Sequence, residues 1–270
     1  MLKENYDLSD LLDIMKLLRS ENGCPWDRDQ DHESLKKYLI EETYEVLEAI
    51  DLKDDRKLCE ELGDLLLQVV FHAQIAAEKA SFNMGSVITG ISRKMVLRHT
   101  HVFGEDKAET PDEVVDNWEA IKKREKGIKS QTGVLKDVPS NLPALMRSYK
   151  VQQKAAQVGF DWDNAEDVFD KINEEIQELK DVYNSQNVER ITDELGDVLF
   201  SVVNLSRFLK VQPELALTGT INKFIKRFEY IEQESLKTGR KLEDMSLVEM
   251  DELWNMAKGN VIKESESNLK

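Results

Sequence analysis

Hydrophobic residues recur along this chain every three or four positions, which is the spacing of one face of an α-helix. The alternation of apolar and polar residues that marks a half-buried strand is not found in the sequence. Helices are predicted over residues 8–20, 32–51, 56–79, 83–103, 111–126, 140–157, 164–182, 187–210, 213–238 and 246–258. Capping-box patterns begin two of them, at Thr110-Pro-Asp-Glu113 and at Ser246-Leu-Val-Glu249. The pattern therefore predicts an all-α fold.

The acidic motifs of the first half of the chain return in the second half. Glu41-Glu-Thr-Tyr-Glu45 returns as Glu174-Glu-Ile-Gln-Glu178. Glu61-Leu-Gly-Asp64 returns as Glu194-Leu-Gly-Asp197, and the distance along the chain from motif to copy is the same in both cases. Two separate motifs at one offset indicate an internal duplication.

Matches on both sides of these motifs extend the repeat at nearly the same offset. They pair Gly23-Cys-Pro-Trp-Asp27 with Gly159-Phe-Asp-Trp-Asp163, Lys94 with Lys223, Arg98 with Arg227, and Trp118 with Trp254. We therefore predict two tandem helical-bundle modules, residues 1–126 and 140–262, with a linker at 127–139 and a tail at 263–270. Each module has a modest core, so a neighbouring module or a second subunit is expected to cover open apolar faces.

Composition and charge limit the possible partners and the location. The 53 acidic and 37 basic residues give a net charge of −16, which disfavours binding to nucleic acid. The longest apolar stretch, residues 65–77, is interrupted by polar residues and is shorter than the about 20 residues that span a membrane, so a buried helix is predicted. The N-terminus lacks a signal-peptide pattern, and Cys24 and Cys59 cannot form a disulfide framework. A cytoplasmic protein with reduced thiols is expected.

Each module contains carboxylates at the spacing of a metal site. Glu42 and Glu45 are three residues apart and share a helix face, as do Glu61 and Asp64. Two antiparallel helices with such pairs would gather four carboxylates, which cannot all remain ionised without a cation. The second module repeats the set as Glu175, Glu178, Glu194 and Asp197. Oxygen ligands favour Mg²⁺, with Mn²⁺ as the substitute. The sequence contains no Glu-x-x-His motif, which argues against a di-iron centre.

The helix that carries Asp64 is apolar nearly all round, so an unpaired charge on Asp64 would be costly there. Asp64 is therefore expected to be protonated, paired with a cation or bound to a metal.

The ordinary alternative for such carboxylates is the salt-bridged surface of a helical bundle. One Glu-Glu-x-x-Glu motif alone is explained equally well by that alternative. The second copy, at the same distance from its Glu-Leu-Gly-Asp motif, favours the metal site. Gly63 and Gly196 lie inside the two Glu-Leu-Gly-Asp motifs, where glycine costs a helix about 1 kcal/mol relative to alanine. We therefore expect something to approach the backbone closely at these glycines.

Basic residues at helical spacing could hold the phosphates of a small anion. Lys223 and Arg227 are four residues apart and share a helix face, as do Lys94 and Arg98. Arginine binds two phosphate oxygens at once and lysine supplies a point charge, which suits a polyphosphate. Without the acidic cluster, such a pair is more often a solvated charged stripe. Trp254 could stack on a base, or be a core or interface residue.

The order of these motifs resembles that of the MazG nucleotide pyrophosphohydrolases, an all-α family whose full-length members have two tandem modules. The carrying residues are Glu-Glu-x-x-Glu followed by Glu-x-x-Asp on consecutive helices, and the resemblance extends over essentially the whole chain. It implies Mg²⁺-dependent hydrolysis of nucleoside triphosphates between the α and β phosphates, which gives a nucleoside monophosphate and pyrophosphate. It further implies broad, house-cleaning use of (d)NTPs, and a homodimer is expected.

The resemblance also implies roles for individual residues. In the C-terminal module it makes Glu175, Glu178, Glu194 and Asp197 the metal ligands and catalytic carboxylates, and Lys171, Glu174, Arg190, Asp193, Lys223, Lys226, Arg227 and Trp254 the substrate contacts. In the N-terminal module a second site would contain Glu42, Glu45, Glu61 and Asp64, with Lys57, Lys94, Arg98 and Trp118 beside them. Tyr38 stands where the second module has Lys171, so the C-terminal module is expected to be the principal catalyst.

Two functions of other classes are consistent with the same pattern. A regulatory protein that binds a nucleotide or alarmone with little turnover would also need the carboxylates. A purely structural helical scaffold would bind no nucleotide, and the duplicated carboxylates make it the weakest of the three hypotheses.

Overall fold

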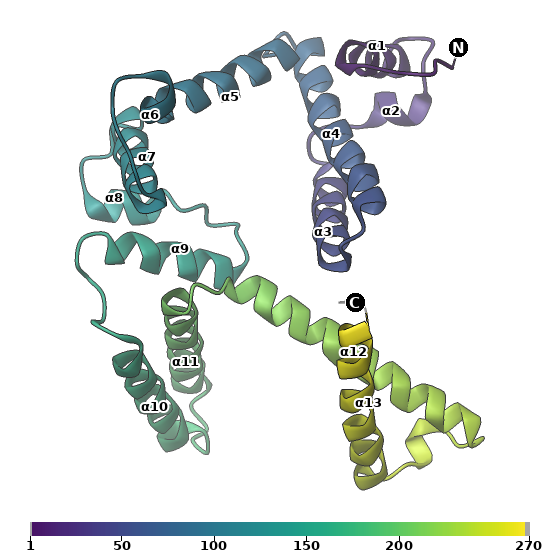
Figure 1. The fold of residues 1–270 in the computed structure, drawn as a ribbon, viewed down its shortest axis with the longest axis vertical. Coiled ribbons are helices and arrows are strands. Elements are labelled where there is room, and N and C mark those ends of the chain that lie inside the picture. Colours follow the sequence, from purple (N-terminus) through teal and green to yellow (C-terminus); the bar gives the residue numbers. More distant parts are fainter. Residues whose placement is uncertain (1, 268–270) are drawn as a thin grey trace. The chain divides into compact units, whose positions relative to one another are not determined.

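The computed structural model describes residues 2–267, with side chains except those of residues 112, 116 and 259–267. Within this range every regular element is a helix and no strand occurs. The predicted all-α fold is therefore confirmed. The chain divides into two compact units, Met1–Lys122 and Lys123–Lys270, so a tandem arrangement of two modules is confirmed as well (Figure 1).

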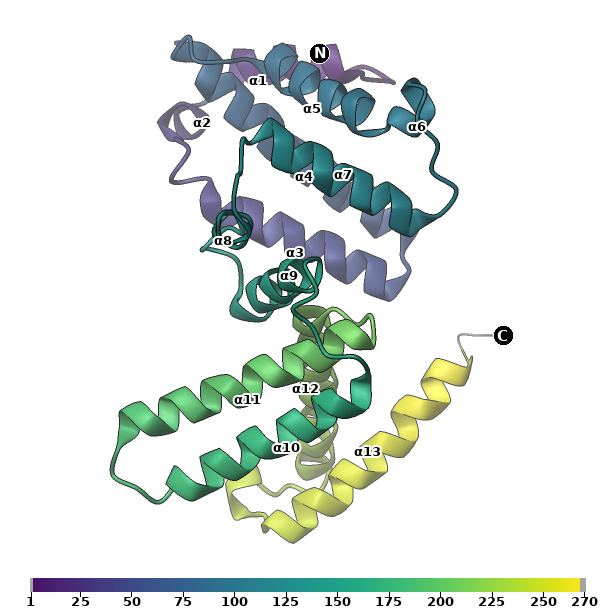
Figure 2. The ribbon, with the colours of Figure 1, turned by 90° about the vertical axis from the view of Figure 1, so that its left-hand side faces the viewer.

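The N-terminal unit is built around a hairpin of two long helices. Its helices are α1 (Leu8–Leu18), α2 (Pro25–Asp29), α3 (Lys36–Leu52), α4 (Asp55–Glu78), α5 (Met84–Arg98), α6 (Thr100–Phe103) and α7 (Pro111–Glu125). Helices α3 and α4 lie side by side, as Figure 2 shows, and α1 and α5 also contact α4. The hairpin turns at Lys53, which has left-handed backbone angles, and Asp54 caps the first turn of α4 with its side chain. A cluster of buried residues, Met15, Leu35, Val70, Phe71 and Ile75, forms the core.

The C-terminal unit repeats this plan. Its elements are α8 (Gln131–Lys136), α9 (Ala144–Ala156), α10 (Ala165–Val182), α11 (Val188–Phe208), α12 (Pro213–Lys237), the 3₁₀ helix η1 (Leu242–Asp244) and α13 (Leu247–Ser267). Helices α10 and α11 form the hairpin that corresponds to α3 and α4, and α9 contacts α11 as α1 contacts α4. Helix α12 leaves the hairpin with α13 beside it (Figure 1). The unit therefore has two helix pairs, α10–α11 and α12–α13.

Short helices account for most differences from the predicted elements. The sequence pattern missed α2 and α8, whose five and six residues are too few to show a helical period. Helix α8 lies inside the predicted linker, where Ser130 caps it and Lys126 pairs with Asp137 at 2.7 Å. The predicted helix 83–103 is divided at His99, whose Nδ1 lies 2.6 Å from the Met95 carbonyl oxygen. Helix α13 continues to Ser267, and the last three residues of the predicted tail lie outside the described residues.

Both predicted capping boxes cap the helices that they precede. At α13 the Ser246 Oγ accepts from the Glu249 N–H at 3.3 Å, and the Glu249 carboxylate accepts from the Ser246 N–H at 2.8 Å. At α7 the Thr110 Oγ1 accepts from the Glu113 N–H at 3.3 Å. The Glu113 carboxylate there accepts from Glu109, one residue before the cap, at 2.8 Å.

The long helices are apolar on more faces than the chain itself covers. Helix α4 was predicted to be buried nearly all round, and this is wrong for Leu62, Leu66 and Val69, which are exposed. Other exposed apolar residues form one stripe on α11 and one on α12: Leu195, Leu199 and Val202, and Ile221, Phe224, Ile225 and Phe228. Each stripe follows the three- and four-residue spacing of one helix face.

Among the described residues, no helix combines the length and the apolar character needed to cross a membrane.

Candidate functional site

The α10–α11 hairpin brings carboxylates from its two helices together. Glu175 comes from α10, and Glu194 and Asp197 come from the first half of α11. One carboxylate oxygen of each lies within 4.8 Å of the other two, which is a distance at which a single cation can contact all three. Glu175 is only 6% exposed, so its charge has little water around it. Buried charges need a partner, and like charges at this distance repel each other.

Glu178 lies next to this group without belonging to its closest set. Desolvation and then the charge of Glu175, with a smaller contribution from Glu194, raise the pKa of the Glu178 carboxyl. Glu178 therefore feels the carboxylate group electrostatically and holds a proton more readily than a free glutamate does.

Two cations offset part of this negative charge. The Lys171 Nζ lies 2.7 Å from a Glu175 oxygen and 2.9 Å from a Glu174 oxygen. Hydrogen bonds to Glu175 and then to Glu174 raise the pKa of Lys171, so its ammonium stays charged. The Arg190 Nε lies 3.8 Å from a Glu194 oxygen. Two cations among this many carboxylates leave a negative site of oxygen donors, which fits a hard divalent cation.

The N-terminal hairpin has a similar group with one important difference. Oxygens of Glu42, Glu45 and Glu61 lie within 4.8 Å of one another, and Glu61 is 8% exposed. Burial and the neighbouring carboxylates raise the pKa values of Glu42 and Glu61. Asp64 lies outside the closest set, although its charge contributes to the shift of Glu42.

Tyr38 and Lys57 stand at the positions of Lys171 and Arg190. Among the described residues, neither forms an ion pair with this N-terminal carboxylate group. Tyr38, at the position of Lys171, is partly buried against the core and meets the Trp26 ring edge-on at 6.0 Å between centroids. Lys37 lies over the Tyr38 ring at 4.6 Å. Lys57, at the position of Arg190, pairs with Glu48. The N-terminal group therefore lacks the direct lysine pair of the C-terminal group.

The two glycines of the repeated Glu-Leu-Gly-Asp motifs do not accept a close neighbour within the chain. A Cβ atom built on Gly63 or on Gly196 would meet nothing within 4 Å. The chain itself therefore makes no close approach at these glycines, and the expected approach stays a prediction for a ligand or a second copy of the chain.

In the C-terminal unit, Lys223, Lys226, Arg227 and Trp254 lie on the other helix pair, α12 and α13. Trp254 of α13 meets the Phe224 ring of α12 at 5.0 Å, and the Arg227 guanidinium lies 5.4 Å from the Trp254 ring centre. Trp254 is thus a contact residue between α12 and α13. Among the described residues, no ion pair joins Lys223, Lys226 or Arg227 to the carboxylates of the hairpin. In the N-terminal unit Trp118 of α7 meets His99 edge-on at 4.8 Å.

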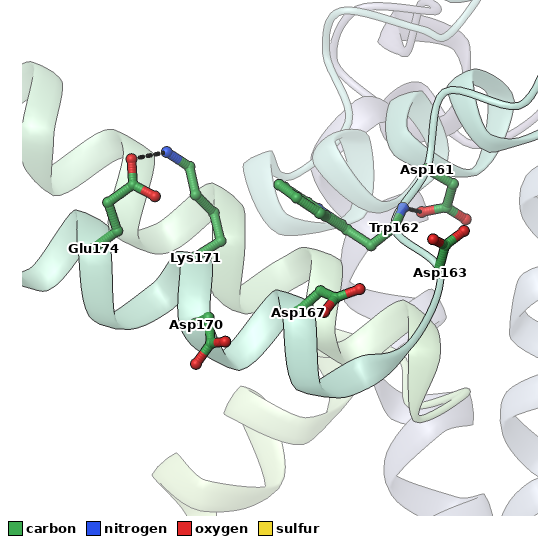
Figure 3. A pocket seen from close by; sticks show the side chains of 7 residues that line it. All are labelled: Asp161, Trp162, Asp163, Asp167, Asp170, Lys171 and Glu174. Carbon is green, nitrogen blue, oxygen red and sulfur yellow. Dashed lines mark hydrogen bonds and ion pairs between the residues drawn. The ribbon is translucent and has the colours of Figure 1, made fainter.

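An acidic trough of about 470 Å³ leads along α10 to Lys171 (Figure 3). One end of it is formed by Asp161, Trp162 and Asp163 in the loop before α10, and its far end is formed by Lys171 and Glu174. Asp167 and Asp170, which the sequence reasoning did not single out, line the middle. Their spacing of three residues, after a Trp-Asp pair that both modules share, was the signal available in the sequence.

Comparison with known proteins agrees with this geometry. The family model of the MazG nucleotide pyrophosphohydrolase domain matches residues 30–103 and 164–231, which contain both hairpins and both carboxylate groups. The chain belongs to the MazG nucleotide pyrophosphohydrolase family. The resemblance drawn from the acidic motifs is therefore confirmed.

Several curated MazG-family relatives are similar over most of this chain. The nucleoside triphosphate pyrophosphohydrolase/pyrophosphatase MazG of Thermotoga maritima is 48% identical, over 93% of this chain and 95% of its own. The nucleoside triphosphate pyrophosphohydrolase of Escherichia coli K12 is 43% identical, over 92% of this chain and 95% of its own. The uncharacterized protein YabN of Bacillus subtilis is 49% identical over 94% of this chain, which corresponds to 52% of YabN.

Proposed function

We propose that this MazG-family chain hydrolyses nucleoside triphosphates to nucleoside monophosphate and pyrophosphate in its C-terminal module with Mg²⁺, for which Mn²⁺ could substitute. It is a hydrolase of the nucleoside triphosphate pyrophosphohydrolase class, in agreement with the names of its relatives in Thermotoga maritima and Escherichia coli. The observation that carries the metal part of the proposal is the convergence of Glu175, Glu194 and Asp197 within 4.8 Å.

Each charged residue of the C-terminal site would have its own role in the reaction. Glu175, Glu194 and Asp197 would hold the cation, which when bound polarises phosphate oxygens and makes water more acidic. Lys171 and Arg190 would turn from their carboxylate partners toward phosphate oxygens of the substrate. Glu178 would take the proton of the attacking water, because its raised pKa makes it a better base than an ordinary carboxylate. Glu174, which pairs with Lys171, would keep that lysine in position.

A second copy of the chain would complete the assembly as a homodimer. The apolar stripes of α11 and α12 are exposed in the single chain, and exposed patches of this kind mark interfaces. Lys223, Lys226, Arg227 and Trp254 lie on the α12–α13 pair, away from the carboxylates. Closure of this pair, or the same pair of the second copy, would bring the predicted substrate contacts to the metal group.

The net charge of the chain and the proposed cation limit the class of substrate. The net charge of −16 opposes nucleic acid, whereas a bound divalent cation lets one small polyanion enter. We propose broad use of (d)NTPs by a cytoplasmic house-cleaning enzyme.

Pyrophosphate release from a panel of nucleoside triphosphates tests the proposal. We expect Glu178→Ala and Glu194→Ala each to lower turnover by about 100-fold or more, because each removes a charge that holds the cation or moves the proton. Glu189→Ala is the matched control, since Glu189 is an exposed glutamate in the first turn of the same helix as Glu194. Undiminished release by both cluster variants would contradict the proposed site.

A further inference from the structure

The C-terminal unit contains a second cavity, of about 420 Å³, which shares Asp161 and Trp162 with the acidic trough. Helices α9 and α11 and the turn before α10 form its walls, which are mostly apolar and aromatic. The apolar lining includes Val151, Ala155, Phe160, Trp162 and Phe200. Neither Glu178 nor any of the three proposed metal ligands lines it. Its size and lining are those of sites that bind small organic molecules.

Two buried polar groups at this cavity lack hydrogen-bond partners. Gln152 is 7% exposed, and its Nε2 donates to the Phe200 carbonyl at 2.8 Å. Only the nitrogen of the amide can donate there, so the orientation of the amide is fixed and Oε1 is its remaining acceptor. That oxygen is buried without a partner, and so is the Arg207 Nε, a donor.

The remaining contacts of Arg207 hold its guanidinium in place. Its Nη2 binds the Asp161 carboxylate and also donates to the Asn204 Oδ1 at 2.9 Å. The cavity therefore offers one unused acceptor and one unused donor from two fixed side chains. Buried polar groups in folded proteins nearly always have a hydrogen-bond partner. A ligand that bonds to both atoms would therefore remove the free-energy cost of leaving them unpaired.

Few classes of ligand match the walls of the cavity and its two unpaired atoms. It must have a flat apolar face for Phe160, Trp162 and Phe200, and an edge that carries an N–H donor and an acceptor. Nucleobases have both features. We propose that this cavity is a nucleobase-binding site, in which Gln152 Oε1 accepts from the base and Arg207 Nε donates to it.

The N-terminal module provides an internal comparison, because a buried arginine stands there at the position of Ala155, which lines the cavity. Arg19 stands in the first module where the second has Ala155, at the offset that relates Trp26 to Trp162, and its side chain is 6% exposed. It pairs with Glu78 at 2.8 Å, donates to the Gln30 carbonyl at 3.1 Å and lies 5.4 Å from the centre of the Phe71 ring. Phe71 corresponds to Asn204, which lines the open cavity.

The first module does not repeat the two residues that supply this acceptor and donor. Lys16 and Gln74 occupy the positions of Gln152 and Arg207. The two modules therefore differ at the residues that line this cavity, with a buried arginine in the first module where the second has an alanine.

Two sources could supply the base. One is the substrate of the proposed function, since Asp161 and Trp162 line both this cavity and the trough that leads to Lys171. The other is a free nucleoside that acts as an effector. The first source rests on the proposed function, whereas the binding itself does not.

Calorimetry of the full-length chain with adenosine, guanosine, cytidine and uridine, without a divalent cation, tests the binding. We expect at least one nucleoside to bind the wild type and none to bind Ala155→Arg, which introduces the arginine of the first module at this position. Phe160→Ala should weaken binding by about tenfold through loss of stacking. Because Phe160 is 82% exposed, its removal does not threaten the fold. Tyr183→Ala, which removes an exposed aromatic outside the cavity, should bind as the wild type does.

Absence of nucleoside binding by the wild type, or wild-type affinity in both Ala155→Arg and Phe160→Ala, would overturn the proposal. Pyrophosphate-release kinetics then identify the source. If the base belongs to the substrate, Phe160→Ala raises KM for nucleoside triphosphates about tenfold, and nucleosides compete with substrate. If it belongs to an effector, nucleosides bind the substrate-saturated protein. A wild type that binds nucleosides but releases no pyrophosphate would refute the proposed function alone.

Discussion

Two glutamates of this protein are unusual because they are buried next to other carboxylates. Glu61 and Glu175 are each more than nine-tenths buried, and each lies within 4.8 Å of two other carboxylates. Lys171 pairs with Glu175, whereas the N-terminal module has Tyr38 at the corresponding position. The N-terminal group thus relies more heavily on an added cation or on protonation to relieve its repulsion.

This repulsion predicts how the metal-free protein responds to pH. The pKa of Glu61 is raised above 4.5 by burial and by Glu45, so the folded state binds its proton more tightly than the unfolded state does. Lowering the pH from 7 toward 5 should therefore stabilise the wild type relative to Glu61→Gln, which has no proton to gain. Thermal unfolding in a chelating buffer at several pH values measures this difference. Parallel pH profiles for the two proteins would contradict the prediction.

At the scale of helices, capping residues fix where the elements begin. Ser246 and Glu249 cap each other at the start of α13, and Arg240 of the preceding segment pairs with Glu249 at 2.7 Å. Hydrogen bonds from Arg240 and then from Ser246 lower the pKa of Glu249 to about 2. The Glu249 side chain therefore joins the segment after α12 to the start of α13, the helix that carries Trp254.

The lowered pKa of Glu249 predicts an acid-dependent stability. A carboxylate whose folded pKa lies below its usual 4.5 stabilises the fold above that value and loses the effect as the pH falls toward 2. Glu249→Gln should therefore unfold at lower temperature than the wild type at pH 7, and the two midpoints should converge at low pH. Unfolding followed by tryptophan fluorescence measures this. A difference that stays constant down to pH 2 would show that the loss comes from packing.

At the scale of the whole molecule, the duplication has produced two unequal modules. Both have a hairpin with three converging carboxylates. In the part of the chain that the structure describes, the direct lysine pair occurs at the C-terminal group, and a cavity lies in the same unit. We expect the double variant Glu42→Ala, Glu61→Ala to keep at least about half of the pyrophosphate release, whereas Glu194→Ala loses nearly all of it. Turnover of both variants with the same triphosphate decides this. Equal losses would mean that both modules catalyse.

The exposed apolar stripes predict the state of assembly. Leu199 is 52% exposed in the middle of the α11 stripe, so Leu199→Glu would place a charge in the proposed dimer interface. Light scattering should then give the mass of one chain for this variant and of two for the wild type. Leu209→Glu, at the exposed C-cap of the same helix, is the control and should remain a dimer. A wild type that is monomeric at all concentrations would refute the homodimer.

The long helices, the duplication and the paired carboxylates of each hairpin could be predicted from the sequence alone. These features are local, because helical geometry alone places residues three and four apart on one face. Short helices such as α2 and α8 escaped because a single turn has no measurable period.

The packing of the helices in three dimensions was needed to show which acids are buried, which cations pair with them, and where open space remains. The helix pattern singled out Asp64 as the costly acid, yet Glu61 is buried and Asp64 is only partly buried. The burial of Arg19 and the cavity beside Ala155 depend on contacts between residues that are far apart in the sequence. Such contacts are set by packing between helices, which no spacing along the chain encodes.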